Sequence, residues 1–205
     1  MDDSYLIYAT VHWGDGIAYS LDVPDLPVTL HVVNGSGQEM LYELFFDENT
    51  GMQPDQHQTV FAFKVGIAQA IEPLTVILDS VMVELPVDAN FVFDSGANPQ
   101  PGQTWQLDQN IQIGEYSLLV VFASADSNGY TFEMLSDTGI ISVALVDLDH
   151  PVIGGGGGEG SAESFSARIM YDGDLPTGPV MVTISSITVV QHGPWRVQWD
   201  PASLR

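Results

Sequence analysis

Residues 182–200 read VTISSITVVQHGPWRVQWD, and the order of apolar and polar residues in this stretch decides the fold. Val182 and Ile184 have one parity along an extended strand, whereas Ile187 has the opposite parity. Side chains alternate strictly along a strand, so an apolar face changes parity only at a bulge, a bend or a break. We place that irregularity at Ser185-Ser186, and we interpret the whole stretch as β-structure.

The second half of the stretch alternates between large apolar and polar residues. Its apolar face consists of Trp195, Val197 and Trp199. This alternation predicts the last strand of a domain, with one face buried and the other in solvent. It therefore places Trp199 in the core of a second domain. The two tryptophans could alternatively form a flat platform on which a sugar stacks. We favour the core, because the matching residues Ala89 and Phe93 of an earlier stretch could not stack a sugar comparably.

That earlier stretch belongs to a degenerate internal repeat. Ser80–Asp94 aligns without gaps on Ser186–Asp200, and Val28–Gly51 aligns on Tyr116–Gly139. The spacing between the two blocks is about 18 residues longer in the second copy. The extra segment coincides with five consecutive glycines, Gly154–Gly158. Because such a run has maximal backbone freedom and no side chains to bury, we expect a flexible inserted loop there.

The rest of the chain also has the composition of strands and turns. Runs rich in Val, Ile, Thr and aromatic residues alternate with Gly, Pro, Asn and Asp. Asn34-Gly35 and Asn128-Gly129 separate apolar runs and predict hairpin turns. We therefore predict an all-β fold of two tandem β-sandwich domains, residues 1–98 and 99–205. The second domain would carry the Gly-rich loop near residues 150–164.

The run that includes Gly193-Pro194-Trp195 and ends near Trp199 resembles the end of a known type of domain. It is similar to immunoglobulin-like domains of unknown function in bacterial surface proteins, including extracytoplasmic regions attached to anti-sigma-factor-like membrane proteins. In the first copy, Val87-Asp88-Ala89 replaces the Gly-Pro-Trp motif. The resemblance implies two immunoglobulin-like β-sandwiches outside the cytoplasm. It implies no catalytic residues.

The charge balance excludes one class of partner. The 205 residues include 27 acids and only four bases, which gives a formal net charge of −23. Nucleic-acid binding rests on Lys and Arg displacing counterions, so we exclude nucleic acid as a partner. Anionic membrane surfaces are disfavoured for the same reason. Cation binding, solubility at a cell surface and life at high salt all fit this charge.

Other features bear on the compartment. The chain has no cysteine, so disulfides and zinc–thiolate sites are excluded. No apolar run approaches the ~18 residues of a membrane span, so we expect no direct membrane insertion. The N-terminal residues lack the basic and apolar regions of a signal peptide. We expect an extracytoplasmic, cell-surface or secreted protein whose signal or anchor lies outside this sequence. Its protein or cell-surface partner is not indicated.

Two acidic pairs are the candidate metal ligands: Asp147 with Asp149, and Asp172 with Asp174. A spacing of two residues projects both carboxylates of a pair to one side of a strand or loop. Calcium takes six to eight oxygen ligands, and loops often supply them. The alternative is that these carboxylates lie on solvated loops, because Asp172-Gly173-Asp174 lacks the rest of any calcium-loop pattern. Apart from possible calcium, we expect no cofactor.

Trp13 and Trp105 lie near the start of the two repeat copies and are the candidate ligand-binding tryptophans. The sequence contains no Gly-x-Ser-x-Gly motif, which would expose a nucleophilic serine on a sharp turn. The five histidines show no paired spacing that would indicate metal ligands or a catalytic base. The leading hypothesis is therefore a non-catalytic, extracytoplasmic binding or structural module. The alternative is a carbohydrate- or calcium-binding β-sandwich module. An enzyme whose site the sequence does not show is a third possibility.

Overall fold

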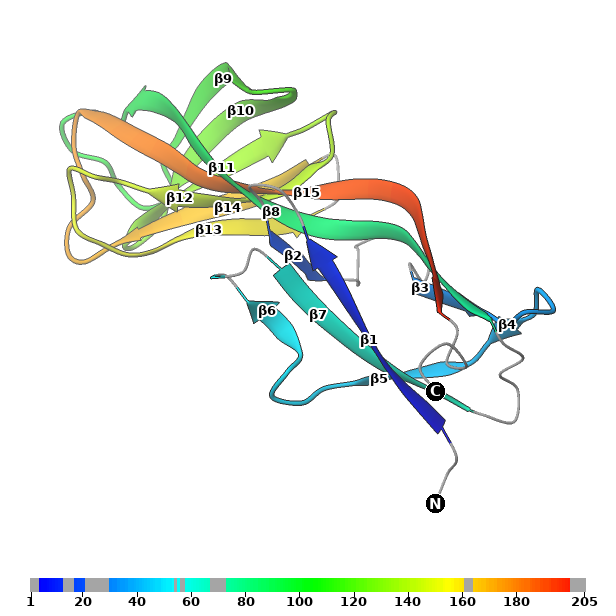
Figure 1. Cartoon of the computed structure of the whole chain (residues 1–205). Coiled ribbons are helices and arrows are strands. Elements are labelled where there is room, and N and C mark those ends of the chain that lie inside the picture. The colour runs from blue at the N-terminus through cyan, green and yellow to red at the C-terminus, as the bar shows by residue number, and fades with distance from the viewer. Residues whose placement is uncertain are drawn as a thin grey trace. The chain divides into compact units, whose positions relative to one another are not determined.

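The computed structural model describes residues 4–12, 17–20, 30–53, 55, 58–66, 73–160 and 164–199 (Figure 1). Strands make up most of these residues and no α-helix occurs among them, which confirms the prediction of an all-β fold. In the described part of the chain, no helix has the length and apolar character needed to cross a membrane.

The chain divides into two compact units. Unit 1 consists of Met1–Val83 together with Val190–Arg205, and unit 2 consists of Glu84–Val189. This division differs from the predicted boundary between residues 98 and 99. The cause is two strands of 21 residues each, β8 (Leu74–Asp94) and β15 (Pro179–Trp199), which contribute to both units. Sequence shows where an apolar face changes sides, but not that the strand continues past that point.

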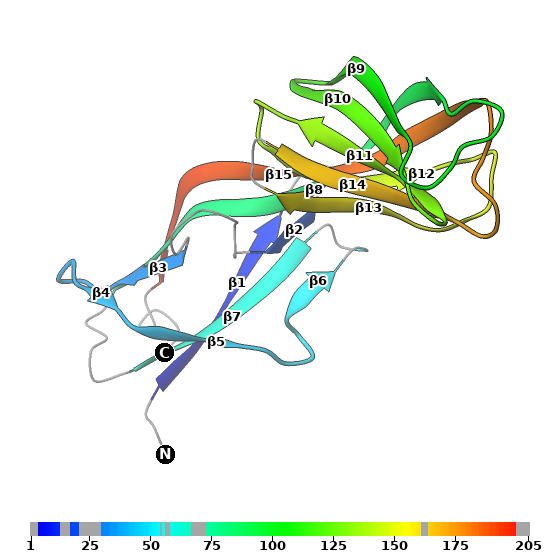
Figure 2. The ribbon, with the colours of Figure 1, turned by 180° about the vertical axis from the view of Figure 1, so that it is seen from behind.

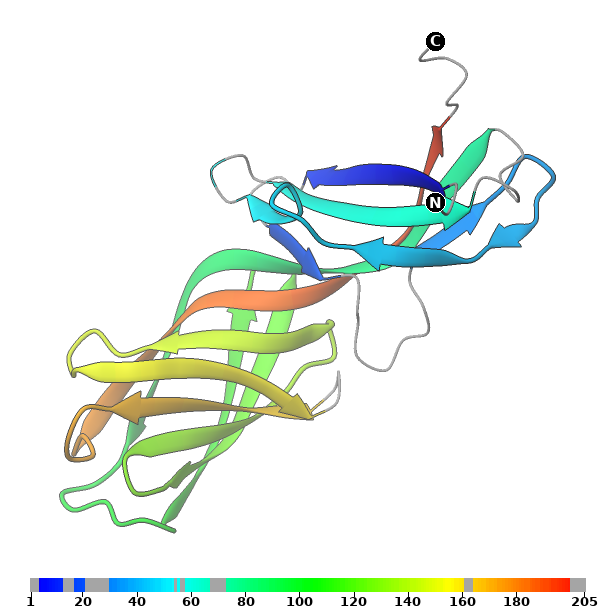
Figure 3. The ribbon, with the colours of Figure 1, turned by 90° about the horizontal axis from the view of Figure 1, so that it is seen from below.

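Unit 1 contains a sheet with the strand order β1-β7-β5, in which β6 also pairs with β7. These pairs are antiparallel, and Ile7 of β1 lies opposite Phe63 of β7. Figure 3 shows β1, β7 and β5 side by side. The strand bounds are β1 (Ser4–His12), β5 (Tyr42–Phe45), β6 (Gly51–Gln53) and β7 (Gln58–Gly66).

The other strands of unit 1 follow the order β4-β3-β8-β15, and β2 pairs with β8. Leu30 of β3 lies opposite Leu78 of β8. The new bounds are β2 (Ile17–Ser20), β3 (Leu30–Val33) and β4 (Glu39–Met40).

Both groups of strands contribute to the core of unit 1. The buried members of this core are Ile7, Leu30, Val32, Met40, Phe63, Val65, Leu74 and Val76. Tyr5, Ala9, Tyr42 and Trp199 pack against them while remaining partly exposed. Full burial of a side chain such as Phe63 or Leu74 contributes roughly 1.5–3 kcal/mol each, so these contacts hold the two groups of strands together.

Unit 2 is formed by strands in the order β8-β15-β12-β13-β14-β11-β10-β9 (Figure 2). The pairings from β15 to β9 are antiparallel. The bounds are β9 (Thr104–Ile113), β10 (Tyr116–Ala125), β11 (Gly129–Leu135), β12 (Ile140–Val146), β13 (Val152–Gly160) and β14 (Ser164–Tyr171).

The strands at the two ends of this order meet, so the sheet of unit 2 curls around its own core. The side-chain amide of Gln109 on β9 donates to the carbonyl of Val92 on β8 at 2.7 Å. Within the core, Phe93 of β8 packs edge-to-face on Tyr130 of β11, with ring centroids 4.9 Å apart. Edge-to-face pairs of this kind add about 0.5–1.5 kcal/mol beyond the area that they bury.

The predicted irregularity at Ser185-Ser186 is confirmed. Along the pairing of β12 with β15, Ala144 lies opposite Ser186 and Leu145 lies opposite Ile184. Ser185 is therefore the extra residue of a β-bulge. The bulge changes the parity of the buried face, as the sequence required, but the strand continues beyond it.

Both Asn-Gly pairs lie in turns, as predicted. Asn34-Gly35 connects β3 to β4, where the Asn34 side-chain oxygen accepts the backbone N–H of Gln38 at 3.0 Å. Residues 126–128 connect β10 to β11, of which Gly129 is the first residue, and the Asp126 N–H donates to the Gly129 carbonyl at 3.0 Å. Each turn sets the register of the antiparallel pair that it joins.

The prediction of a flexible loop at Gly154–Gly158 is wrong, because these residues belong to strand β13 between β12 and β14. A Cβ on Gly156 would lie 2.8 Å from the Val143 carbonyl oxygen, and one on Gly157 would lie 2.7 Å from that of Ser166. Both residues also have positive φ, +141° and +152°. The glycines are therefore required by close backbone approach on both sides, not by freedom of movement.

Candidate ligand-binding groove

An apolar groove of about 410 Å³ opens between strands of unit 1. Strand β1 forms one wall with residues 7–12, and β15 forms the opposite wall with Trp195, Val197 and Trp199. Residues of β3, β7 and β8 complete it: Leu30, Phe61, Phe63, Val76 and Leu78. Its size lies within the range of sites that hold small molecules.

The floor of the groove is the core of unit 1. Ile7, Leu30, Phe63 and Val76 line the groove and also belong to the buried core cluster. A ligand in the groove would therefore contact side chains that are held in place by packing on their other sides. Such a preformed apolar floor reduces the ordering cost of binding.

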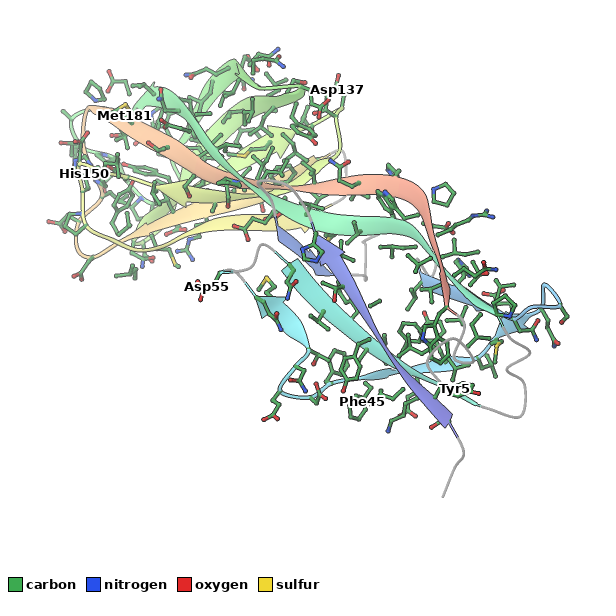
Figure 4. All side chains as sticks on the ribbon, viewed as in Figure 1. Tyr5, Phe45, Asp55, Asp137, His150 and Met181 are labelled. Carbon is green, nitrogen blue, oxygen red and sulfur yellow. The ribbon has the colours of Figure 1, made fainter. Side chains whose placement is uncertain are left out.

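The wall formed by β15 corrects the prediction for its tryptophans. Trp195 is 37% exposed and Val197 is 66% exposed, so neither belongs to a core. Trp199 is half-buried and packs on unit 1 instead of in a second-domain core. Its ring lies edge-on to that of Tyr5, with centroids 5.1 Å apart (Tyr5 is labelled in Figure 4). The alternating pattern is real, but its apolar face lines an open groove.

Gly193 explains how β15 reaches this position. A Cβ on Gly193 would collide with the backbone carbonyl of Leu78 on β8, and also with Trp195. Glycine is therefore needed where the two backbones approach each other. Leu78 and Trp195 both line the groove, so this close contact fixes one end of the β15 wall beside β8.

The lining is rich in aromatic rings, and the residues of it that the structure describes include no Lys, Arg, Asp or Glu. Four of its rings come from Phe61, Phe63, Trp195 and Trp199. Thr10 and His12 on β1 supply polar side chains. A cleft of this composition can hold a largely apolar ligand, stack a planar group or receive a cation on a ring face.

The strand β1 is tied to its surroundings by Tyr8. The Tyr8 hydroxyl donates to the Asp47 carboxylate at 2.6 Å. This hydrogen bond raises the pKa of Tyr8 and lowers the pKa of Asp47. Asp47 therefore stays ionised at neutral pH and adds a negative charge near strand β1.

Neither tryptophan predicted to bind a ligand is among the described lining residues of the groove. Trp13 lies outside the described residues. Trp105 is on β9 of unit 2, where its ring packs edge-on to Phe93 and Tyr130, both with centroids 5.8 Å away. Trp105 is therefore part of the aromatic packing of unit 2, and it is not in the groove.

The four predicted metal ligands have different environments. The Asp147 side chain is fully buried, whereas Asp149, Asp172 and Asp174 are exposed. Among the residues that the structure describes, no group of three or more His, Asp or Glu side chains is arranged to hold a metal ion. Calcium binding by these residues stays a prediction.

The carboxylate of Asp147 organises the turn after β12 in unit 2. One oxygen accepts the backbone N–H groups of Asp149, at 2.9 Å, and His150, at 3.1 Å. The other lies 2.8 Å from the His150 ring nitrogen Nδ1 and accepts the Tyr171 hydroxyl at 3.2 Å (His150 is labelled in Figure 4). These bonds satisfy a buried charge, which would otherwise be costly.

Tyr171 responds to this environment. Burial, and then the neighbouring negative charge of Asp147, raise the pKa of Tyr171 far above its ordinary value. The phenol therefore remains a neutral hydrogen-bond donor over the whole physiological pH range.

Comparisons with known proteins add no family and no relative. No family model, no curated protein and no solved structure matches the chain.

Sequence reasoning missed most of the groove. Nothing in the residues of β1 or in Phe61 distinguishes a groove wall from an ordinary strand. The useful signal was the large apolar face of Trp195, Val197 and Trp199, which the sequence did reveal. Whether such a face is covered depends on the packing of distant strands, which a local pattern does not contain.

Proposed function

We propose that the chain is a non-catalytic binding module and that the groove of unit 1 is its ligand site. The observation that carries this proposal is the combination of a rigid apolar floor with the exposed side chains Trp195 and Val197 at the rim. Exposed apolar surface beside a concave site is typical of ligand-binding grooves.

Binding of Nile red, a neutral apolar dye, tests this proposal. We expect its fluorescence to rise on the wild-type protein and to saturate. The variant Val197→Asp places a charge in the β15 wall at a side chain that is already 66% exposed, so folding should survive. It should weaken dye binding at least tenfold, which corresponds to about 1.4 kcal/mol.

A matched control is available in unit 2. Val92 is also an exposed strand valine, 45% exposed, and lies outside the groove. Val92→Asp should leave dye binding unchanged. Equal loss in both variants, or saturable binding that neither variant affects, would place the dye elsewhere and overturn the assignment of the groove.

The proposal includes the location and architecture expected from sequence: an extracytoplasmic protein with two immunoglobulin-like units related by a degenerate repeat. Several equivalent positions support the repeat. Leu30 and Leu118 are both buried. Gly51 and Gly139 both have positive φ, +100° and +83°. The blocks that align at Ser80 and Ser186 lie in strands of equal length.

A carbohydrate ligand is the second candidate, favoured by the tryptophans of the groove wall. Trp195 and Trp199 share the side of β15 that lines the groove. Flat indole rings can stack on the apolar face of a sugar ring. An aryl glucoside therefore belongs among the probes used below.

A further inference from the structure

We propose that the groove selects a cationic ligand, one that joins an apolar body to an ammonium group. This inference rests on the proposed binding function and specifies the class of ligand. Two observations support it: the aromatic lining of the groove, whose described residues include no Lys, Arg, Asp or Glu, and the strongly negative charge of the whole chain.

The lining offers favourable sites for a cation without a carboxylate partner. The faces of Trp, Phe and Tyr rings carry partial negative charge, and Trp attracts cations most strongly. Trp195 and Trp199 stand in one wall, and the half-buried Phe61 contributes from β7, whereas the Phe63 ring is buried in the floor. An ammonium group on an apolar body can therefore enter the groove while its body covers the apolar floor.

The negative charge of the chain also favours a positively charged ligand. The chain carries a net charge of −23. Fields of this size raise the local concentration of cations near a cleft and lower that of anions. Salt screens exposed charges over a Debye length of about 8 Å at physiological ionic strength, so the preference should depend on salt.

The few bases of the chain do not oppose this selection. Of the bases that the structure describes, Lys64, Arg168 and Arg196, none lines the groove. Lys64 lies over the Phe45 ring, 4.4 Å from its centroid, and Arg168 pairs with Asp126 in unit 2 at 2.8 Å. Arg196 is next to Trp195 in the sequence, but strand alternation directs it to the side opposite Trp195 and Val197.

Anionic ligands are disfavoured in this site. A carboxylate or phosphate in the groove would need Arg, Lys or several N–H donors to replace its water, and no Arg or Lys occurs among the lining residues that the structure describes. A neutral apolar ligand would bind through burial alone. Charge therefore distinguishes the three kinds of occupant, and a matched set of probes can separate them.

The experiment compares three phenyl compounds that differ in charge: phenyltrimethylammonium, phenyl β-D-glucopyranoside and phenyl phosphate. Affinities are measured by titration calorimetry on the whole chain at low and at high sodium chloride. We expect the cation to bind at least tenfold tighter than either other probe at low salt. Its advantage should shrink at high salt.

The variant Trp195→Leu separates the aromatic contribution from the apolar one. It keeps an apolar side chain at an exposed position, so folding should be retained, and Nile red should lose less affinity than the cationic probe. Loss of one cation–ring contact at an exposed site should weaken the cationic probe about threefold to fivefold. The Val92→Asp variant again serves as the control with unchanged affinities.

The outcomes distinguish the two proposals. If Nile red binds in the groove but the glucoside or the phosphate matches the cation, the cationic selectivity is wrong and the binding function stands. A tighter glucoside would favour a carbohydrate ligand. If neither Nile red nor any phenyl probe binds, the binding function itself is overturned.

Discussion

At the scale of single residues, the most informative group is the buried contact of Asp147 with Tyr171. Sequence pointed to Asp147 as a calcium ligand, yet both of its oxygens already accept hydrogen bonds from within unit 2. The i, i+2 spacing with Asp149 reflects a turn in which the first carboxylate accepts the second residue's N–H. Spacing alone does not tell a metal loop from such a turn.

The raised pKa of Tyr171 leads us to expect that unit 2 loses stability at alkaline pH. Its pKa is raised in the folded protein from an ordinary value of 10.0, so both states hold the proton below pH 10. Above pH 10 only the unfolded chain releases it, and the stability of unit 2 falls as pH rises. Tyr171→Phe should cost about 1 kcal/mol at neutral pH and make the alkaline decline less steep.

Denaturant melts of unit 2 at neutral pH and above pH 10 check this expectation. Tyr8→Phe is the control, because Tyr8 belongs to unit 1. The control should leave the alkaline decline of unit 2 as it is in the wild type. An unchanged decline in Tyr171→Phe would show that this phenol does not cause it.

At the scale of elements, strand β13 shows most clearly what sequence could not provide. A run of five glycines fits a loop by composition, and local propensity contains no opposing signal. Glycine is required in this strand because carbonyl groups of β12 and β14 lie where the Cβ atoms of other residues would stand. That requirement comes from partners in sheet pairing, so the local pattern was misleading.

Gly157→Ala should therefore destabilise unit 2 by at least ~2 kcal/mol, from a positive φ together with a collision with the Ser166 carbonyl. Gly173→Ala is the matched control. Gly173 has a φ of +121°, but nothing lies within 4 Å of its Cβ position. A denaturant melt should show a clearly larger loss for Gly157→Ala. Equal losses would mean that the strain of φ alone sets the cost.

Other elements were predictable from sequence for identifiable reasons. Strict alternation revealed the bulge at Ser185, because parity is a local property of the chain. The aromatic face of Trp195 and Trp199 was also visible as a face. Its exposure was not, because it depends on how β1 and β15 border the same groove.

At the scale of the whole molecule, the net charge of −23 is the dominant property. Repulsion among so many like charges favours expanded states, and added salt screens it. We expect the melting temperature to rise as sodium chloride is increased from low concentration. A melting temperature independent of salt would contradict this expectation. Calcium chloride at matched ionic strength is the comparison, and a much larger rise with calcium would support a specific calcium site.

The predicted tandem domains and the observed units differ in when each part of the chain can fold during synthesis. In tandem, each half could fold as soon as it left the ribosome. Unit 1, however, needs residues on both sides of unit 2 in the sequence, Met1–Val83 and Val190–Arg205. All of unit 2 is synthesised between them, which takes on the order of ten seconds at typical elongation rates. The nascent chain must therefore hold the first strands of unit 1 incomplete, and its groove gains the β15 wall only after unit 2 has been synthesised.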